Sequence, residues 1–164
     1  MPNLNIATSI DDLLPASQLM TMSGLEFMEK MRDGELPRPP IAETLNFVLS
    51  SVEAGKVTFK GTPEFNQTNP MGTVHGGWYG TILDSCMACA VMTIVPKGSI
   101  YTTLEYKINI NRSIPLGLAV MATGTLQHAG RSTGTAIGEI RGVEDGKLYA
   151  TGSTTCIIMD PSKR

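Results

Sequence analysis

The sequence predicts an α+β domain in which an antiparallel β-sheet wraps around one long central helix. Three observations lead to this fold class. Two segments that alternate apolar and polar residues come first, one long apolar helical run follows, and four further alternating segments complete the chain. Strands grouped on both sides of a single helix indicate an antiparallel sheet packed on that helix. The length of 164 residues fits one such domain.

The composition agrees with a folded protein and excludes several function classes. Hydrophobic residues make up 41% of the chain and charged residues 17%, which is ordinary for a domain with a buried core. The formal net charge is −2 and no block of like charges occurs, so nucleic acid and anionic membranes are not expected as partners. The N-terminal residues lack a basic start followed by an apolar core, as a signal peptide would have. A cytoplasmic location is therefore expected.

Residues 1–40 are predicted to form an N-terminal arm with short helical segments, ahead of the main domain at residues 41–164. Residues 11–14 and 23–31 have the spacing of short amphipathic helical turns. The arm is rich in methionine, which commonly fills a core or an interface. The run Pro37-Arg38-Pro39-Pro40 ends the arm, because prolines remove backbone donors and favour extended backbone.

Strands are predicted on both sides of the helix. Residues 44–49 and 56–60 alternate apolar and polar side chains, and Glu53-Ala54-Gly55 between them indicates a hairpin turn. A loop with several prolines and asparagines follows at residues 61–72. Pro96-Lys97-Gly98 ends the helix. The later strands are expected at residues 101–111, 118–128, 133–143 and 147–159.

The central helix carries one acid among apolar residues. Apolar side chains recur at three- and four-residue steps from about Gly76 to Ile94, and other faces are filled by Ala, Cys and Met, so burial nearly all round is expected. Asp84 interrupts this run, and the ten residues after it are uncharged. A carboxylate there loses its hydration, so it needs donors, a shifted pKa or a function. Cys86 and Cys89 lack a second pair of ligands, so no metal site is predicted.

The helix start carries a motif that resembles a known family. Asn69, Gly72, Thr73, His75, Gly76 and Gly77 form Asn-x-x-Gly-Thr-x-His-Gly-Gly, with Asp84 nine residues after the histidine. This pattern resembles the PaaI-type, phenylacetate-degradation-like branch of the hotdog-fold acyl-CoA thioesterases. The resemblance continues through residues 103–109 and 130–131, and it covers about residues 41–159. It implies a hotdog thioesterase domain that uses no cofactor other than the coenzyme A of its substrate.

The resemblance implies the catalytic residues. The backbone N–H of Gly76, at the helix N-terminus, would point at the thioester oxygen. Asp84 would act either as a nucleophile or as a general base on water. Asn69 would fix the water or the carbonyl group. Thr103 would steady the nucleophilic water, with Thr102 as the alternative.

Further residues are expected to bind the substrate. His75 and Gly77 belong to the motif, and the ring nitrogens of His75 would orient the loop through hydrogen bonds. The absence of a Gly-x-Ser-x-Gly sequence disfavours acyl-enzyme chemistry on Ser85 or Cys86.

The turn formed by Gly130, Arg131 and Ser132 is the candidate site for the phosphates of coenzyme A. A guanidinium group binds phosphate through two parallel hydrogen bonds, which favours Arg131 for this role. Lys107 and Arg112 are the alternatives.

The resemblance also implies that each active site is shared by two subunits. Gly76 and Asn69 would come from one subunit and Asp84 from the other. Gly76 and Asp84 of one chain would lie about 12 Å apart along the helix, too far to hold the same thioester carbon. A homodimer is therefore the expected minimum, and a dimer of dimers is expected to form from it.

Two other functions are compatible with this fold. An enoyl-thioester hydratase pairs an acid with a catalytic histidine, but no histidine follows Asp84 in the helix. A non-catalytic acyl-CoA-binding module has no need of Asp84. The acyl group of the expected acyl-CoA substrate stays open among aryl, short and medium chains, and Trp78, Tyr79, Met87 and the methionines of the arm are candidates to line its pocket.

Overall fold

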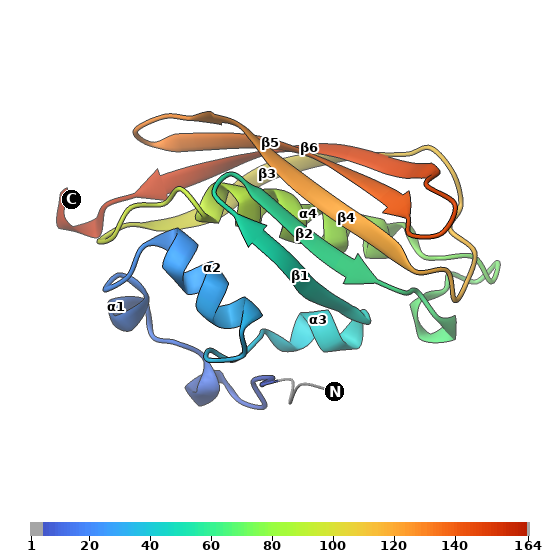
Figure 1. The fold of residues 1–164 in the computed structure, drawn as a ribbon, viewed down its shortest axis with the longest axis horizontal. Coiled ribbons are helices and arrows are strands. Elements are labelled where there is room, and N and C mark those ends of the chain that lie inside the picture. The colour runs from blue at the N-terminus through green and yellow to red at the C-terminus, as the bar shows by residue number, and fades with distance from the viewer. Residues whose placement is uncertain (1–4, 164) are drawn as a thin grey trace.

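The computed structural model describes residues 5–163 and has a six-stranded antiparallel sheet wrapped around a central helix, α4 (Gly76–Met92). The predicted fold class is confirmed. Figure 1 shows α4 inside the curve of the sheet. The strand order is β1-β2-β4-β5-β6-β3. The strands are β1 (Phe47–Glu53), β2 (Lys56–Gly61), β3 (Ile100–Ile110), β4 (Val120–Ala129), β5 (Thr133–Gly142) and β6 (Leu148–Met159).

Helix α4 forms the centre of the core. His75 is its N-cap, and the helix ends at Met92 ahead of Pro96. Most of its residues are buried, as the apolar sequence predicts. No helix within residues 5–163 is long and apolar enough to cross a membrane.

Glycines allow the sheet to approach α4 closely. A Cβ added at Gly124 of β4 would overlap the backbone carbonyl of Cys86. A Cβ added at Gly138 of β5 would come within 2.7 Å of the Met87 side chain. These two strands can therefore contact α4 only because they have no side chain at these positions.

The N-terminal residues form short helices beside β1. They comprise η1 (Ile10–Asp12), α1 (Ala16–Leu19), α2 (Gly24–Arg32) and α3 (Pro40–Thr44). Elsewhere in the chain, two short 3-10 turns follow β2 and β6, namely η2 (Phe65–Gln67) and η3 (Pro161–Lys163). Ser23 is the N-cap of helix α2, and its Oγ accepts a hydrogen bond from the Glu26 N–H at 3.2 Å. Met28 of this helix is part of the hydrophobic core. The division of the chain at residue 40 stays a prediction.

The prediction of a strand beginning at Thr44 is wrong. Pro39 caps α3 and Pro40 occupies its first turn, so residues 40–44 are helical and β1 begins at Phe47. Proline at the start of a helix is favourable, because its φ is already helical and its missing N–H is not needed there. Asn46, with a φ of 52°, then turns the chain into the strand.

Strand β3 lies at one edge of the sheet and contains a bulge. Its register with β6 shifts between Thr103 and Glu105. Thr103 and Tyr106 consequently both face α4, since Thr103 bonds to Asp84 and the Tyr106 hydroxyl lies 3.3 Å from a Cβ built on Gly80.

Candidate active site

The Asp84 carboxylate of α4 is hydrogen-bonded to the Thr103 hydroxyl of β3. We call these two residues the carboxylate pair. The Thr103 Oγ1 donates a hydrogen bond to the Asp84 Oδ1 at 3.1 Å. Asp84 is only partly accessible to solvent. Burial raises the pKa of Asp84 from its usual 3.8, and the Thr103 hydrogen bond opposes that shift. Thr102 is exposed, so the structure places Thr103 and not Thr102 beside the acid.

The start of α4 presents one unused backbone donor. His75 Nδ1 accepts a hydrogen bond from the Gly77 N–H at 2.9 Å, and the Trp78 N–H bonds to the His75 carbonyl. Within residues 5–163 the Gly76 N–H has no hydrogen-bond partner. A Cβ built on Gly76 would meet only Ile110, at 3.7 Å. An electronegative atom could thus approach this N–H at the positive end of the helix dipole.

Asn69 organises the turn that leads into α4. Its Oδ1 accepts hydrogen bonds from the backbone N–H of Met71 at 2.9 Å and of Thr73 at 3.2 Å. Its Nδ2 donates to the Thr73 hydroxyl at 2.8 Å. Gly72 closes the turn with a φ of 76°, a conformation that favours glycine. We call Asn69, His75, Gly76 and Gly77 the helix-start group.

The turn at residues 130–132 lies at the opposite end of α4. Gly130 and Arg131 line a hollow together with Ile94 and Pro96, which follow the helix C-terminus. The backbone holds this turn, because the Gly130 N–H bonds to the Thr133 carbonyl at 2.7 Å and the Ser132 carbonyl accepts from the Ile158 N–H at 2.8 Å. Arg131 is exposed. Helix α4 has 17 residues and is therefore about 25 Å long.

One chain therefore assembles three separate parts of the predicted site. The carboxylate pair, the helix-start group and the 130–132 turn are each in place. Along α4, the helix-start group and Asp84 are about 12 Å apart, and the turn lies beyond the other helix end. The parts can act on one substrate only if another chain supplies some of them.

Two residues between these parts were missed from sequence. Tyr106 and Ile110 lie next to the first turns of α4, through Gly80 and Gly76 respectively. They are 46% and 47% exposed although they are large and apolar. Strand alternation could have found them, but the bulge at Leu104 shifts which residues of β3 face the helix.

Trp78, Tyr79 and Met87, proposed to line an acyl pocket, lie instead in the core. Trp78 donates from Nε1 to the Leu45 carbonyl at 2.8 Å, and the Tyr79 hydroxyl accepts from the Ile114 N–H at 2.8 Å. Met87 is completely buried against the sheet. That expectation is wrong for these three side chains.

The cysteines of α4 are poor nucleophiles. Burial raises the pKa of Cys86, and it raises that of Cys89 to about 12. The thiolate, which is the reactive form, is therefore scarce at neutral pH. Among residues 5–163 no group of three or more His, Cys, Asp or Glu side chains has the arrangement of a metal site.

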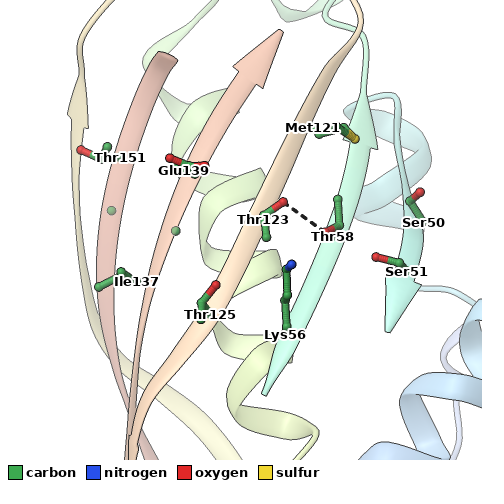
Figure 2. A pocket seen from close by; sticks show the side chains of 12 residues that line it. Ser50, Ser51, Lys56, Thr58, Met121, Thr123, Thr125, Ile137, Glu139 and Thr151 are labelled. Carbon is green, nitrogen blue, oxygen red and sulfur yellow. Dashed lines mark hydrogen bonds between the residues drawn. The ribbon is translucent and has the colours of Figure 1, made fainter. Parts of the chain in front are cut away.

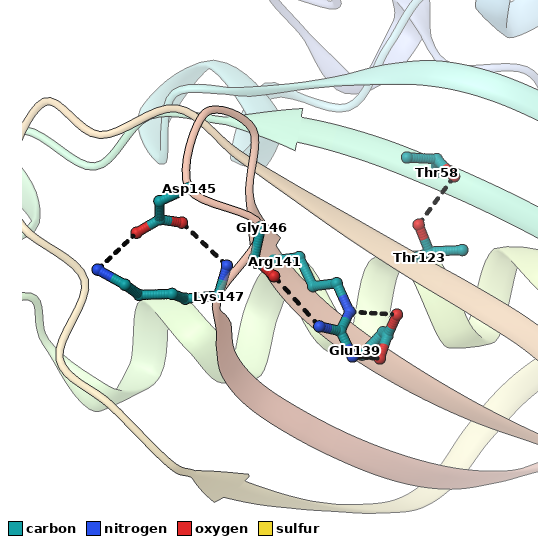
Figure 3. A network of polar contacts seen from close by, with 7 residues as sticks. All are labelled: Thr58, Thr123, Glu139, Arg141, Asp145, Gly146 and Lys147. Carbon is teal, nitrogen blue, oxygen red and sulfur yellow. Dashed lines mark hydrogen bonds and ion pairs between the residues drawn. The ribbon is translucent and has the colours of Figure 1, made fainter.

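A hollow of about 800 Å³ crosses the outer face of the sheet, away from α4 (Figure 2). It is rich in hydroxyl groups, and Thr58 and Thr123 share a hydrogen bond of 3.1 Å across it. Its acid, Glu139, pairs with Arg141 at 2.9 Å (Figure 3). None of the predicted site residues lines this hollow, so the carboxylate pair remains the candidate site.

Comparison with known proteins identifies the family. No curated protein matches the chain. The model of the thioesterase superfamily matches residues 71–149. A phenylacetic acid degradation-related protein from Ralstonia eutropha JMP134 is 31% identical, with a TM-score of 0.72 over 80% of this chain and 98% of that chain.

Two further solved structures share the fold. A mutant of the phenylacetic acid degradation protein PaaI from Thermus thermophilus is 25% identical, with a TM-score of 0.65 over 72% of this chain and 97% of that chain. A protein from Streptococcus mutans UA159, solved with acetyl CoA bound, is 24% identical, with a TM-score of 0.63 over 70% of this chain and 90% of that chain. The chain therefore belongs to the thioesterase superfamily and has its hotdog fold.

Proposed function

We propose that this protein hydrolyses acyl-CoA thioesters to a free acid and coenzyme A, with Asp84 as the catalytic acid-base group. The observation that carries this proposal is the bond of Asp84 to Thr103 in otherwise apolar surroundings. A raised pKa makes a carboxylate a stronger base, so burial prepares Asp84 to accept a proton from water. Membership of the thioesterase superfamily supports the reaction type.

In the general-base route, Asp84 takes a proton from water as the water oxygen attacks the thioester carbon. Negative charge develops on the former carbonyl oxygen, and the free Gly76 N–H is proposed to stabilise it. The tetrahedral intermediate then expels the coenzyme A thiolate, which receives the proton from Asp84. In the nucleophilic route, Asp84 itself attacks the carbon, and the C–S bond breaks to release the coenzyme A thiolate and leave a mixed anhydride. Water then hydrolyses the anhydride, which releases the free acid, regenerates the Asp84 carboxylate and supplies the proton that the thiolate takes up.

The proposed active unit is a homodimer, in which Gly76 of one subunit faces Asp84 of the partner subunit. The exposed edge strand β3 supports this proposal. Leu104, Tyr106 and Ile110 are 58%, 46% and 47% exposed. An 11-residue edge strand with large apolar side chains favours pairing with another strand. Pairing of two such dimers is part of the same proposal.

Coenzyme A is proposed to bind along the surface with its phosphates near Arg131. Arg131 is exposed at a turn held by backbone hydrogen bonds, so its guanidinium can reach a ligand. The acetyl CoA bound to the Streptococcus mutans protein of the same fold supports this ligand class. The proposed reaction uses water and these residues and requires no cofactor.

A panel of aryl, short-chain and medium-chain acyl-CoAs, with a thiol reagent that detects released coenzyme A, tests this function. The wild-type protein should release coenzyme A from at least one class. Asp84→Asn should lower kcat by about 10²- to 10⁴-fold, because the base is lost. A circular dichroism spectrum identical to the wild type is the control for folding.

Near-normal hydrolysis by Asp84→Asn would show that Asp84 is not the catalytic acid-base group. Hydration of an enoyl-CoA without release of coenzyme A would indicate a hydratase. Binding without any turnover would indicate an acyl-CoA-binding module.

A further inference from the structure

An apolar cavity of about 210 Å³ lies under the N-terminal helices. It is enclosed by α2, α3, β1 and α4, and by the start of β3. The walls include Phe27, Met31, Ile41, Ser85, Cys89 and Tyr101. Carbon atoms dominate these walls, so the cavity suits a hydrocarbon chain.

The cavity adjoins the carboxylate pair. Ser85 directly follows Asp84 on α4, and Tyr101 lies two residues before Thr103 on β3. The register of β3 with β6 is regular between residues 101 and 103, so Tyr101 and Thr103 lie on the same face of the strand. Asp84 and Thr103 do not line the cavity themselves, so an acyl chain whose carbonyl group lies at Asp84 would enter it past Ser85 and Tyr101.

Arg38 introduces a positive charge into the cavity wall. Its residue is only 9% exposed, and it lines the cavity together with Pro39 and Ala42. The Nε atom is buried without a hydrogen bond, and within residues 5–163 the guanidinium forms no ion pair. Arginine keeps its charge at any physiological pH. The buried Nε is a charged donor without an acceptor among the described residues, and such a donor is costly, which supports an acceptor supplied by a ligand.

The backbone of Arg38 is held in place. Its N–H donates to the Asn5 carbonyl at 2.8 Å, and its carbonyl accepts from the Ala7 N–H at 3.0 Å. Pro37 and Pro39 flank it and fix the local φ angles. The backbone from which the guanidinium side chain extends is therefore fixed before any ligand arrives.

Glu43 is an acid near Arg38. Both residues line a neighbouring hollow of about 230 Å³. Glu43 is exposed, and it forms no ion pair with Arg38. Within the described chain, then, the guanidinium is left for a ligand.

We propose that Arg38 binds a carboxylate at the far end of the acyl chain, so that the preferred substrates are coenzyme A thioesters of short dicarboxylic acids. This inference rests on the proposed function. A volume of about 210 Å³ is smaller than the roughly 300 Å³ at which ordinary ligand pockets begin, so it suits a short chain. An adipyl group is such a chain, with a carboxylate at its far end.

Adipyl-CoA and hexanoyl-CoA form a matched pair of probes, because they have the same number of acyl carbons and differ in the terminal carboxylate. The wild-type protein should have the higher kcat/KM for adipyl-CoA. Arg38→Met keeps the length of the side chain and removes its charge. It should lower kcat/KM for adipyl-CoA by about 10- to 100-fold, since a charged hydrogen bond is lost, and leave hexanoyl-CoA hydrolysis equal or faster.

Arg32→Met is the control variant. Arg32 lies on α2 and pairs at the surface with Asp33 at 2.8 Å, so its loss should leave the ratio of the two substrates unchanged. The thermal midpoint of Arg38→Met should equal or exceed that of the wild type, because a buried charge without a partner is removed. A lower midpoint, matched by Glu43→Gln, would show that Glu43 is the partner of Arg38 and would overturn the inference.

Other outcomes separate this inference from the proposed function. Hydrolysis of hexanoyl-CoA without preference for adipyl-CoA would overturn only the inference. Hydrolysis of neither, with another acyl-CoA of the panel cleaved, would also overturn only the inference. Release of coenzyme A from no acyl-CoA of the panel would overturn the proposed function, and calorimetric Kd values of both thioesters for the wild type and Arg38→Met would then test Arg38 alone. Equal Kd values for the two thioesters would overturn the inference too.

Discussion

Two opposing effects set the pKa of Asp84. Burial raises the value and the Thr103 hydrogen bond lowers it, with burial the stronger. A carboxyl group whose pKa is higher in the folded than in the unfolded state favours folding at low pH. That contribution is lost as the pH rises through the folded-state pKa. At neutral pH the ionised Asp84 therefore reduces stability, as is common for groups kept for catalysis.

Thr103→Val tests the proposed function of the carboxylate pair. The substitution removes the hydrogen bond that lowers the Asp84 pKa, so this pKa should rise further. The base must be ionised to act. The acidic limb of the profile of kcat against pH should therefore move to higher pH, and kcat at the acidic pH values within that limb should fall. The measurement is kcat for one acyl-CoA between about pH 4 and 8.

Thr102→Val is the matched control for this experiment, since Thr102 is exposed and precedes Thr103 directly. Its profile should follow the wild type. An equal shift in both variants, or a shift in neither, would contradict the proposed role of the Thr103 hydroxyl.

Single residues differed in how far the sequence could predict them. The motif identified Asp84 and His75, because spacing along one helix is a local property. It left Thr102 and Thr103 as alternatives, since only the pairing of β3 with α4 decides which hydroxyl meets the acid. Arg38 was interpreted only as part of a proline-rich segment. Its burial depends on how the N-terminal helices pack on the sheet, which sequence periodicity does not describe.

The secondary-structure elements follow the sequence where one pattern dominates. Helix α4 and strands β3 to β6 lie within a few residues of their predicted ranges, because apolar periodicity is strong there. Helix α3 was missed, because its two leading prolines were interpreted as extended backbone. Proline has both roles, and only the residues that follow it decide between a helix start and an extended segment.

The contact between α4 and the sheet predicts different effects for two glycine substitutions. In Gly124→Ala the new methyl group would meet the Cys86 backbone, which cannot move without displacing the helix. The free energy of unfolding should fall by about 3 kcal/mol or more. In Gly138→Ala the methyl group would meet the flexible Met87 side chain, so the loss should be smaller, about 1 kcal/mol.

Urea denaturation followed by circular dichroism measures both losses. Gly76→Ala is the control, since its added Cβ would make only an ordinary contact with Ile110 at 3.7 Å. If Gly124→Ala proved as stable as Gly138→Ala, the close approach of β4 to α4 would not be maintained in solution.

At the scale of the whole molecule, one chain contains the helix-start group and Asp84 but does not bring them close together. The helix-start group and Asp84 are about 12 Å apart along α4, and β3 leaves a long apolar edge uncovered. The family resemblance of the motif implies that Gly76 and Asp84 act in different subunits. The distance along a rigid helix gives the physical reason, because α4 cannot bend to bring its own Gly76 to its own Asp84.

Subunit mixing tests the proposed shared site directly. Asp84→Asn should be inactive because its base is lost, and Gly76→Val should be inactive because a branched side chain blocks access to the backbone N–H. A mixed dimer of the two has one site with both Gly76 and Asp84 intact, if these residues come from different subunits. Random mixing in equal amounts should then restore about a quarter of the wild-type sites.

The two variants are co-refolded from urea, and coenzyme A release is measured against each variant refolded alone. A mixture of Asp84→Asn with the Asp84→Asn, Gly76→Val double variant is the control, since no pairing of these chains has an intact site. Coenzyme A release is expected to recover only in the first mixture, because only there can an intact Asp84 of one subunit face an intact Gly76 of its partner. If the first mixture stays as inactive as its components although sedimentation shows mixed dimers, each chain must form its site alone. The distance between Gly76 and Asp84 along α4 would then have to be bridged by a different oxyanion donor.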